Sequence, residues 1–371
     1  MLSLSNKLLA CVCLLLAVPS SAHAASAKTR GPKTGGAETA VPAAERYARR
    51  CQPDEPRLRG HTTQGTLLWG TKQGWRPRPA TNEATSVLAS ANLDAPPRAP
   101  EGVKALRVEG GHLTASMDAA AVKGALAPES SLAGTVLRGA GSDGQPVEVA
   151  LCGAEPSPED PGMVWYRVEV WNPVVQDWEN PCVATGQVPQ PRALAMSGVW
   201  DSEGAHHDVA GKITFACENG VIAKCARWGY KPWASRNGQP LADLHQACTR
   251  MARADYCGNG RSHTQENTMI DYYDSAGVSS RTTEVSEAWD PARGSFEAAW
   301  APDGAVCLGR TRDGHALSTL FKECPGRFQT GAVDLGDGDL CKAVRPDVNA
   351  KTAPLRNRSY GGQRHTAGRQ P

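Results

Sequence analysis

Residues 164–171, VWYRVEVW, decide the fold class, because apolar and polar side chains alternate along them with the period of a β-strand. One face of this strand is wholly apolar apart from a tyrosine hydroxyl, and the other mixes tryptophan with charge: Val164, Tyr166, Val168 and Val170 against Trp165, Arg167, Glu169 and Trp171. A strand with one such apolar face belongs to a sheet that covers a core. The stretch therefore predicts a β-rich protein.

Two hairpins are predicted around this strand. Apolar runs at 132–137 and 146–151 flank a Gly- and Asp-rich stretch, which is the pattern of two paired strands. Runs at 212–216 and 221–223 flank Asn219-Gly220, and Asn-Gly between apolar runs is a strong hairpin signal. Further strands are expected at 66–69, 104–108, 270–273, 281–289, 295–300 and 305–308.

One segment follows a helical period instead. From Pro240, apolar residues recur every three or four positions as far as Ala252, and Cys257-Gly258 ends the pattern. Cys248 lies on the apolar side and should anchor this helix to the core. The predicted fold class is β-rich α+β, a disulfide-stapled secreted domain of short strands and hairpins with one prominent helix.

Cysteine usage places the chain in an oxidising compartment. The chain has 12 cysteines, and Cys11 and Cys13 lie within an N-terminal signal-like segment, which leaves ten. An even number in an exported chain predicts about five disulfides, although spacing cannot fix their pairing. Structural zinc is not expected from the cysteines, because no C-x2-4-C pair occurs. The disulfide candidates are Cys51, Cys152, Cys182, Cys217, Cys225, Cys248, Cys257, Cys307, Cys324 and Cys341.

Export is predicted from residues 1–24. An apolar run at 8–18 is too short to span a bilayer, and Ala22-His23-Ala24 suits signal-peptide cleavage. The protein is therefore expected in the periplasm or outside the cell, with no transmembrane segment. A formal charge of +2 offers no case for nucleic-acid or membrane binding.

Composition divides the rest of the chain. Residues 25–60 are expected to form a flexible leader, and 61–127 a small β segment or N-terminal extension. Residues 128–344 should be the disulfide-rich domain. Residues 345–371 carry many arginines and no apolar period, which predicts a basic disordered tail.

A short motif carries a resemblance to a known family. Ala254-Asp255-Tyr256-Cys257, directly after the predicted helix and before Gly258-Asn259-Gly260, resembles the signature of the ADYC-domain family. Other segments resemble the same family: 198–201 (GVWD), 215–217 (FAC), 224–225 (KC), 228–233 (WGYKPW) and 302–307 (PDGAVC). The resemblance covers about 132–328 and implies an exported bacterial protein. It implies no activity, ligand or catalytic residue.

Several polar groups deserve weighing as catalytic or metal sites. Cys257 with His245 or His263 would suit a thiol nucleophile and its base, but that chemistry needs a free thiolate, and a disulfide is expected. His206-His207-Asp208 is expected to be an exposed loop, because adjacent histidines on a strand diverge. Asp334, Asp337 and Asp339 do not match the spacing of an EF-hand. We predict no metal, no cofactor and no catalytic residue.

Two patterns bear on binding and hydrolysis. Trp228, Tyr230 and Trp233 are a possible binding cluster if exposed, and core if buried; core is the favoured interpretation. Paired carboxylates near two tyrosines would suit a glycosidase: Asp271 and Asp274, with Glu284 and Glu287 further on. The leading hypothesis is an exported, non-catalytic envelope or secreted module that binds a surface polymer or protein. The alternative is a secreted hydrolase of cell-wall or environmental polymers.

Overall fold

The computed structural model describes residues 41–52, 67–75, 85–117, 129–186, 188–264 and 268–360. These residues belong to one compact unit that begins at Val41. The predicted signal peptide, much of the predicted leader and residues 361–371 lie outside the described residues. No helix among the described residues is both long enough and apolar enough to cross a membrane.

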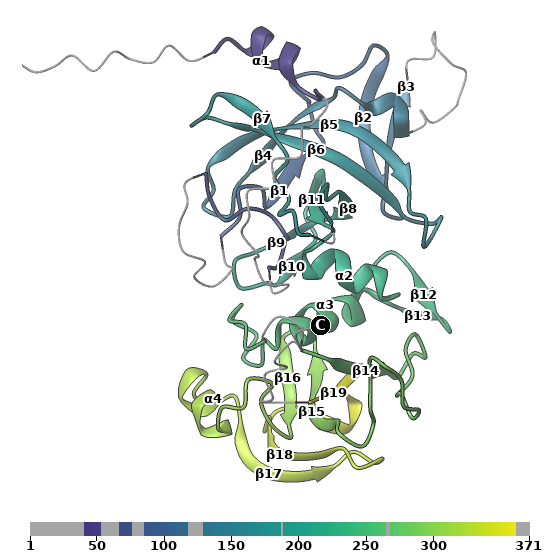
Figure 1. Ribbon diagram of the computed structural model, residues 1–371, viewed down its shortest axis with the longest axis vertical. Helices are drawn as coiled ribbons and strands as arrows, with labels where there is room; N and C mark the ends of the chain where they lie inside the picture. Colours follow the sequence, from purple (N-terminus) through teal and green to yellow (C-terminus); the bar gives the residue numbers. More distant parts are fainter. Residues whose placement is uncertain are drawn as a thin grey trace, which may run out of the picture. The chain divides into compact units, whose positions relative to one another are not determined.

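The first sheet closes on itself (Figure 1). Its antiparallel order is β5-β4-β1-β11-β8-β6, and β6 pairs back onto β5, while β7 extends the sheet beyond β6. The strands are β1 (Ser90–Asn92), β4 (Val136–Ala140), β5 (Pro146–Pro156), β6 (Val164–Asn172), β7 (Asp177–Glu179), β8 (Ala193–Ser197) and β11 (Lys212–Cys217). Such closure removes free strand edges and creates a small barrel.

The predicted strand at 164–171 is β6, and its apolar face fills the barrel. Val164, Tyr166, Val168 and Val170 lie in one buried cluster with residues of the facing strands, including Phe215. The rings of Tyr166 and Phe215 meet edge-on, with their centroids 6.5 Å apart. The opposite face lies outside the barrel and packs against other elements. The alternation in the sequence thus corresponds to the inside and outside of the barrel.

A second antiparallel sheet follows in the chain, with the order β14-β19-β15-β16-β18-β17. Its strands are β14 (Ile270–Asp274), β15 (Ser295–Ala301), β16 (Gly304–Leu308), β17 (Gln329–Asp334), β18 (Leu340–Val344) and β19 (Leu355–Ser359). The remaining elements are short: α1 (Ala43–Arg49), α4 (Leu317–Glu323), two 3-10 turns (Glu129–Leu132 and Ala350–Thr352), and the hairpins β2 (Val103–Glu109) with β3 (His112–Met117), β9 (Val199–Trp200) with β10 (His206–His207), and β12 (Ser235–Arg236) with β13 (Gln239–Pro240).

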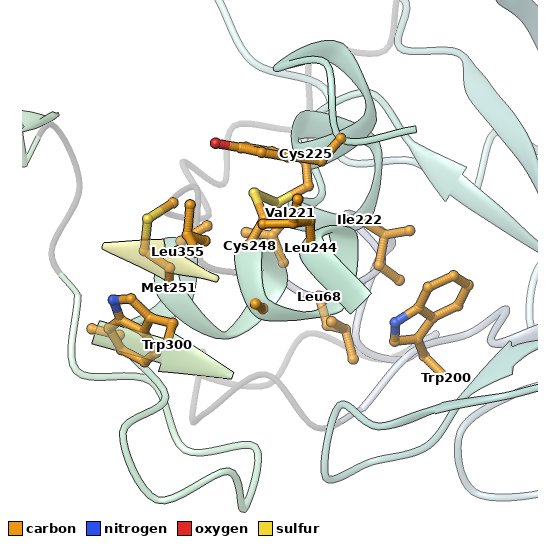
Figure 2. Packing of buried hydrophobic residues seen from close by; sticks show 14 of the residues in the cluster. Leu68, Trp200, Val221, Ile222, Cys225, Leu244, Cys248, Met251, Trp300 and Leu355 are labelled. Atoms are coloured by element: carbon orange, nitrogen blue, oxygen red, sulfur yellow. A yellow bond between two sulfur atoms is a disulfide. The ribbon is translucent and has the colours of Figure 1, made fainter. Parts of the chain in front are cut away.

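Two helices lie between the sheets, α2 (Val221–Arg227) and α3 (Ala242–Arg253) (Figure 1). The apolar face of α3 is the one that the sequence predicts, and the helix ends where Ala254 adopts a left-handed conformation with φ 52°. Ile222 and Trp200 belong to the same core as Trp300 and Leu355 of the second sheet (Figure 2). The helices therefore join the two sheets through a shared core.

All ten predicted cysteines are paired. Cys225–Cys248 ties α2 to α3 inside the core (Figure 2), and Cys51–Cys152 ties the end of α1 to β5. The other bonds are Cys182–Cys217, Cys257–Cys324 and Cys307–Cys341. The disulfide-stapled, β-rich fold class is thereby confirmed.

The predicted hairpin at Asn219-Gly220 is wrong. The first strand exists as β11, but the second run forms α2, and Gly220 is its N-cap with φ −81° rather than the positive φ of a type I′ turn. Glycine is needed here for another reason: a Cβ on Gly220 would lie 2.5 Å from the backbone carbonyl carbon of Trp69. A three-residue apolar run suits either structure, and packing against α3 decided it.

Four other expectations also need correction. Residues 281–289 contain no strand, and 67–69 are buried without forming one. The predicted disordered tail at 345–371 is wrong as far as residue 359. Residues 355–359 form β19, which lies inside the second sheet between β14 and β15. Residues 43–49 of the expected leader form α1, since Cys51 is bonded to the barrel. Strand β1, within the 61–127 segment, pairs with β4 and β11 and so belongs to the barrel.

One buried histidine should make the fold acid-sensitive. His245 on α3 is 1% exposed and donates a hydrogen bond to the carbonyl of Ile222 over 3.0 Å. Burial outweighs that hydrogen bond and lowers the pKa of His245 to about 4. Below pH about 6.5 the unfolded chain takes up a proton that the folded chain does not, so stability should fall between pH 6.5 and 4, by about 3 kcal/mol in total.

Urea unfolding of the wild type and His245→Gln at pH 7, 5 and 4 measures this effect. The glutamine amide keeps a donor but does not titrate, so the variant should show the shallower loss on acidification. His112→Gln, which replaces a partly exposed histidine hydrogen-bonded to the carbonyl of Gly162, serves as the control and should retain the slope of the wild type. Equal slopes for His245→Gln and the wild type would contradict the assignment.

Candidate functional site

The four motif residues after α3 each have a structural role. Ala254 ends the helix in a left-handed conformation, which turns the chain toward the second sheet. Asp255 is fully buried; it pairs with Arg250 at 2.6 Å and accepts hydrogen bonds from the backbone amides of Asn259 and Gly260. These contacts fold the loop that follows the helix. Asp255 thus caps a turn, as carboxylates commonly do.

Tyr256 connects the loop to the second sheet. Its ring stacks on Trp300 with centroids 5.3 Å apart, and its hydroxyl donates to Glu297 over 3.1 Å. The same hydroxyl accepts a hydrogen bond from the backbone amide of Arg312. Burial and the neighbouring Glu297 raise the pKa of Tyr256 well above its usual value, so this hydroxyl stays protonated.

Cys257 cannot act as a resting nucleophile, because it is bonded to Cys324. His245 and His263 are therefore not activating a thiol. Asp271 pairs with buried Arg358 at 2.7 Å, and Asp274 accepts hydrogen bonds from Tyr230 and from three backbone amides. Both carboxylates serve contacts that hold β14 in place. Glu284 and Glu287 are exposed in a segment without regular structure.

The residues weighed as metal ligands in the sequence either form contacts with other side chains or lie apart from one another. His207 pairs with Asp201 at 2.7 Å, whereas His206 is 3.9 Å from Asp208, beyond bonding distance. Asp339 is fully buried and accepts from Tyr273 over 2.6 Å and from Arg281 over 3.1 Å. Asp334 and Asp337 are exposed. None of these groups forms a cluster of three ligands in the described part of the chain.

The aromatic cluster predicted as core or binding site is mostly core. Tyr230 is fully buried, and Trp228 stacks on Tyr272 with centroids 4.9 Å apart. Trp233 is partly buried against the core. It also covers the tight turn between β2 and β3, where a Cβ on Gly111 would lie 2.7 Å from its ring. The three aromatic side chains thus pack in or against the core.

A groove beside the β4–β5 hairpin of the barrel is a candidate binding site. Its volume is about 910 Å³, which is within the range of small-molecule sites. Three half-buried aromatic side chains line it, namely Tyr47 of α1, Trp171 at the end of β6, and Trp75. Backbone and polar groups of the β4–β5 hairpin form another part of the lining.

Charges in the groove balance one another. Arg46 forms an ion pair with Glu148 at 2.9 Å, and the Tyr47 hydroxyl donates to the same carboxylate over 2.7 Å. The guanidinium of Arg46 lies 5.4 Å from the centroid of Trp171. Arg138 and Asp143, both exposed, also line the groove with opposite charges. The lining thus combines aromatic faces with hydrogen-bonding groups and has no strong net charge.

The sequence signalled only one part of this groove. Trp171 is on the outward face of the strand at 164–171, where a large aromatic residue suggests contact with something other than the barrel core. The sequence predicts a flexible leader around Tyr47 and a small β segment or N-terminal extension around Trp75. Both residues reach the groove because the Cys51–Cys152 bond brings α1 to the barrel and because the segment at 67–75 packs beside β11.

A family model, the ADYC domain, matches residues 129–314, which is half of the chain. The chain belongs to the ADYC domain family. Neither a curated protein nor a solved structure matches it.

The ADYC domain contains most of the barrel, both central helices and the start of the second sheet, from β4 to β16. Its boundaries cross both sheets, since β1 precedes it and β17, β18 and β19 follow it. The motif that gives the ADYC domain its name lies where α3 meets the second sheet. Its buried residues therefore mark the junction between the helix and the second sheet.

Proposed function

We propose that this chain is an exported binding module that holds a neutral polysaccharide chain of the cell surface in the groove beside β6. Five disulfides support export, because such bonds persist in oxidising compartments. The proposal rests on the groove, which has a volume of about 910 Å³ and is lined by the aromatic side chains of Tyr47, Trp75 and Trp171.

The chemistry of the lining suits sugar rings. Aromatic faces pack against the C–H faces of sugars, while amides, hydroxyls and charged groups form hydrogen bonds with their hydroxyls. Gln73, Ser142 and Gln145 provide such groups beside Arg138 and Asp143. The balanced charge favours a neutral chain over a polyanion, since binding a polyanion requires an excess of cations.

Binding should depend on the groove aromatics. We expect Trp171→Ala to weaken polysaccharide binding at least tenfold, because tryptophan contacts are commonly among the strongest in an interface. Arg138→Ala, at an exposed position, should weaken it less without disturbing the fold. The measurement is affinity electrophoresis and calorimetry of the disulfide-intact protein against bacterial polysaccharides and peptidoglycan fragments.

Trp233→Ala is the matched control, since it removes a partly buried tryptophan outside the groove. It should bind as the wild type does. If wild-type protein binds none of the glycans, or if Trp171→Ala and Trp233→Ala bind equally well, the groove is not a polysaccharide site. Thermal unfolding of each variant shows whether lost binding reflects lost folding.

A further inference from the structure

Four titratable side chains converge at the end of α4, away from the residues of the groove. His263 follows α3, Asp313 and His315 follow β16, and Glu323 is the last residue of α4. The Nδ1 atoms of His263 and His315 lie 3.1 and 2.8 Å from the same carboxylate oxygen, Oδ2 of Asp313. The Nε2 atom of His263 lies 3.1 Å from Glu323.

Rigid elements hold this cluster, which we call the His263 cluster. The backbone amide of His263 donates to the carbonyl of Arg253 over 3.1 Å, which ties it to the end of α3. The Cys257–Cys324 bond joins the loop after α3 to the residue directly after Glu323. The backbone amide of His315 donates to Asp313 over 3.2 Å. Ligand groups supported in this way keep their positions without a bound ion.

The cluster attracts positive charge. The side chains of His263, Asp313 and Glu323 are only 6, 11 and 8% exposed, so two carboxylates lie almost buried around one imidazole. If Nε2 of His263 donates its proton to Glu323, its Nδ1 presents a lone pair toward a carboxylate oxygen. That contact is repulsive unless a proton or a metal ion lies between the two atoms.

Burial opposes a charge on the imidazole, yet the two carboxylates outweigh it and raise the pKa of His263. For Asp313 burial is likewise outweighed, by hydrogen bonds from both histidines, and its pKa is held well below its usual range. The carboxylates therefore stay ionised and attract positive charge. Arg261 supplies one positive charge, because its guanidinium lies 3.4 Å from Glu323. Positive charge at Asp313 can come from a proton on His263 or from a divalent cation held by the carboxylate and the two histidines beside it.

The geometry points to a zinc site formed by His263, Asp313 and His315, with Glu323 as the group that orients His263. Ligand atoms of the three residues all lie within 4.8 Å of one another. Tetrahedral zinc needs ligand atoms about 3.4 Å apart, so the contacts of 3.1 and 2.8 Å have to widen by about 0.3 and 0.6 Å, and the two histidine nitrogens have to lie at a similar separation. Two histidines and one carboxylate are a familiar zinc ligand set, which leaves a fourth position for water.

Glu323 occupies the place that a supporting carboxylate takes in such sites. Metal-bound histidines commonly donate their other N–H to a carboxylate, which fixes the tautomer and the ring orientation. The Nε2 of His263 lies 3.2 Å from Glu323 and donates to it in the tautomer that leaves Nδ1 for the ion. The side chain of His315 is 66% exposed, so an ion can enter from solvent on that side.

Zinc titration tests the site directly. The disulfide-intact protein, treated with EDTA and dialysed, should bind one Zn²⁺ in calorimetry, and Co²⁺ should give the visible absorption of a four-coordinate complex. His315→Ala, at an exposed position, should weaken zinc binding at least 100-fold while leaving folding unchanged. Glu323→Gln should weaken it by 10- to 100-fold.

His207→Ala is the matched control, because it removes a half-exposed histidine paired with one carboxylate, Asp201, at 2.7 Å. It should bind zinc as the wild type does. If the wild type binds no zinc, or if His315→Ala binds as tightly as His207→Ala, the inference is overturned and His263 is an imidazolium held between two carboxylates. Neither result depends on polysaccharide binding, so the two proposals can fail separately.

Discussion

Arg312→Met should lower the free energy of unfolding by about 3–5 kcal/mol, the largest loss that we expect from a single substitution. The guanidinium of Arg312 pairs with both oxygens of Glu297, at 3.0 and 2.8 Å, and both side chains are almost fully buried. It also donates to the carbonyls of Met251 and Ala252 in the last turn of α3. Without it, Glu297 is a buried carboxylate that has lost its counter-charge.

Chemical denaturation of the wild type and the variant measures this loss. Glu297→Gln combined with Arg312→Met provides the comparison, since it removes both charges. The double variant should be more stable than Arg312→Met alone, because the penalty comes mainly from the unpaired charge rather than from the lost pair. A loss below about 1 kcal/mol in Arg312→Met would show that the buried pair does not hold α3 to the second sheet.

Removing the Cys257–Cys324 bond should cost about 2–5 kcal/mol. Its cysteines are 67 residues apart, so the bond restricts a long loop in the unfolded chain. We expect Cys257→Ala with Cys324→Ala to fold less stably and to exchange amide hydrogens faster in α4, whose end this bond secures. Guanidinium unfolding and hydrogen exchange measure the two effects.

Cys307→Ala with Cys341→Ala is the matched control for this second prediction. It removes a bond inside the second sheet, between β16 and β18, and should leave exchange in α4 nearly unchanged. Equal protection of α4 in both double variants would contradict the idea that Cys257–Cys324 holds that helix. Zinc binding by the Cys257/Cys324 variant should weaken as well, because Glu323 adjoins the broken bond.

The hydrophobic pattern of a segment predicted its secondary structure correctly where it fitted only one period, that of a strand or that of a helix. The alternation at 164–171 gave β6 with the predicted inward face, and the 3.6-residue period from Leu241 gave α3. Both segments are long enough for one period to exclude the other. The run at 221–223 was too short, and it became α2 because Cys225 and Ile222 pack into the core between the sheets.

Strand β19 shows why the sequence pattern did not predict a strand in this polar segment. Its sequence, LRNRS, has no apolar period, yet Asn357, Arg358 and Ser359 are buried in the second sheet. Asn357 accepts from the indole of Trp300, and Arg358 pairs with Asp271. Burial of such a strand is stable only because its partners are present, and they come from distant parts of the chain.

The amino-acid sequence by itself determined the fold class, the number of cysteines available for pairing and the position of the ADYC motif, because composition and local periodicity depend on neighbouring residues alone. Tertiary structure decided the disulfide pairing, the closure of the barrel, the groove and the His263 cluster. His263 and His315 lie on separate loops, and only the packing of α3, α4 and the second sheet brings them to one carboxylate. Sites of this kind depend on contacts between segments far apart in sequence, and no local pattern encodes such contacts.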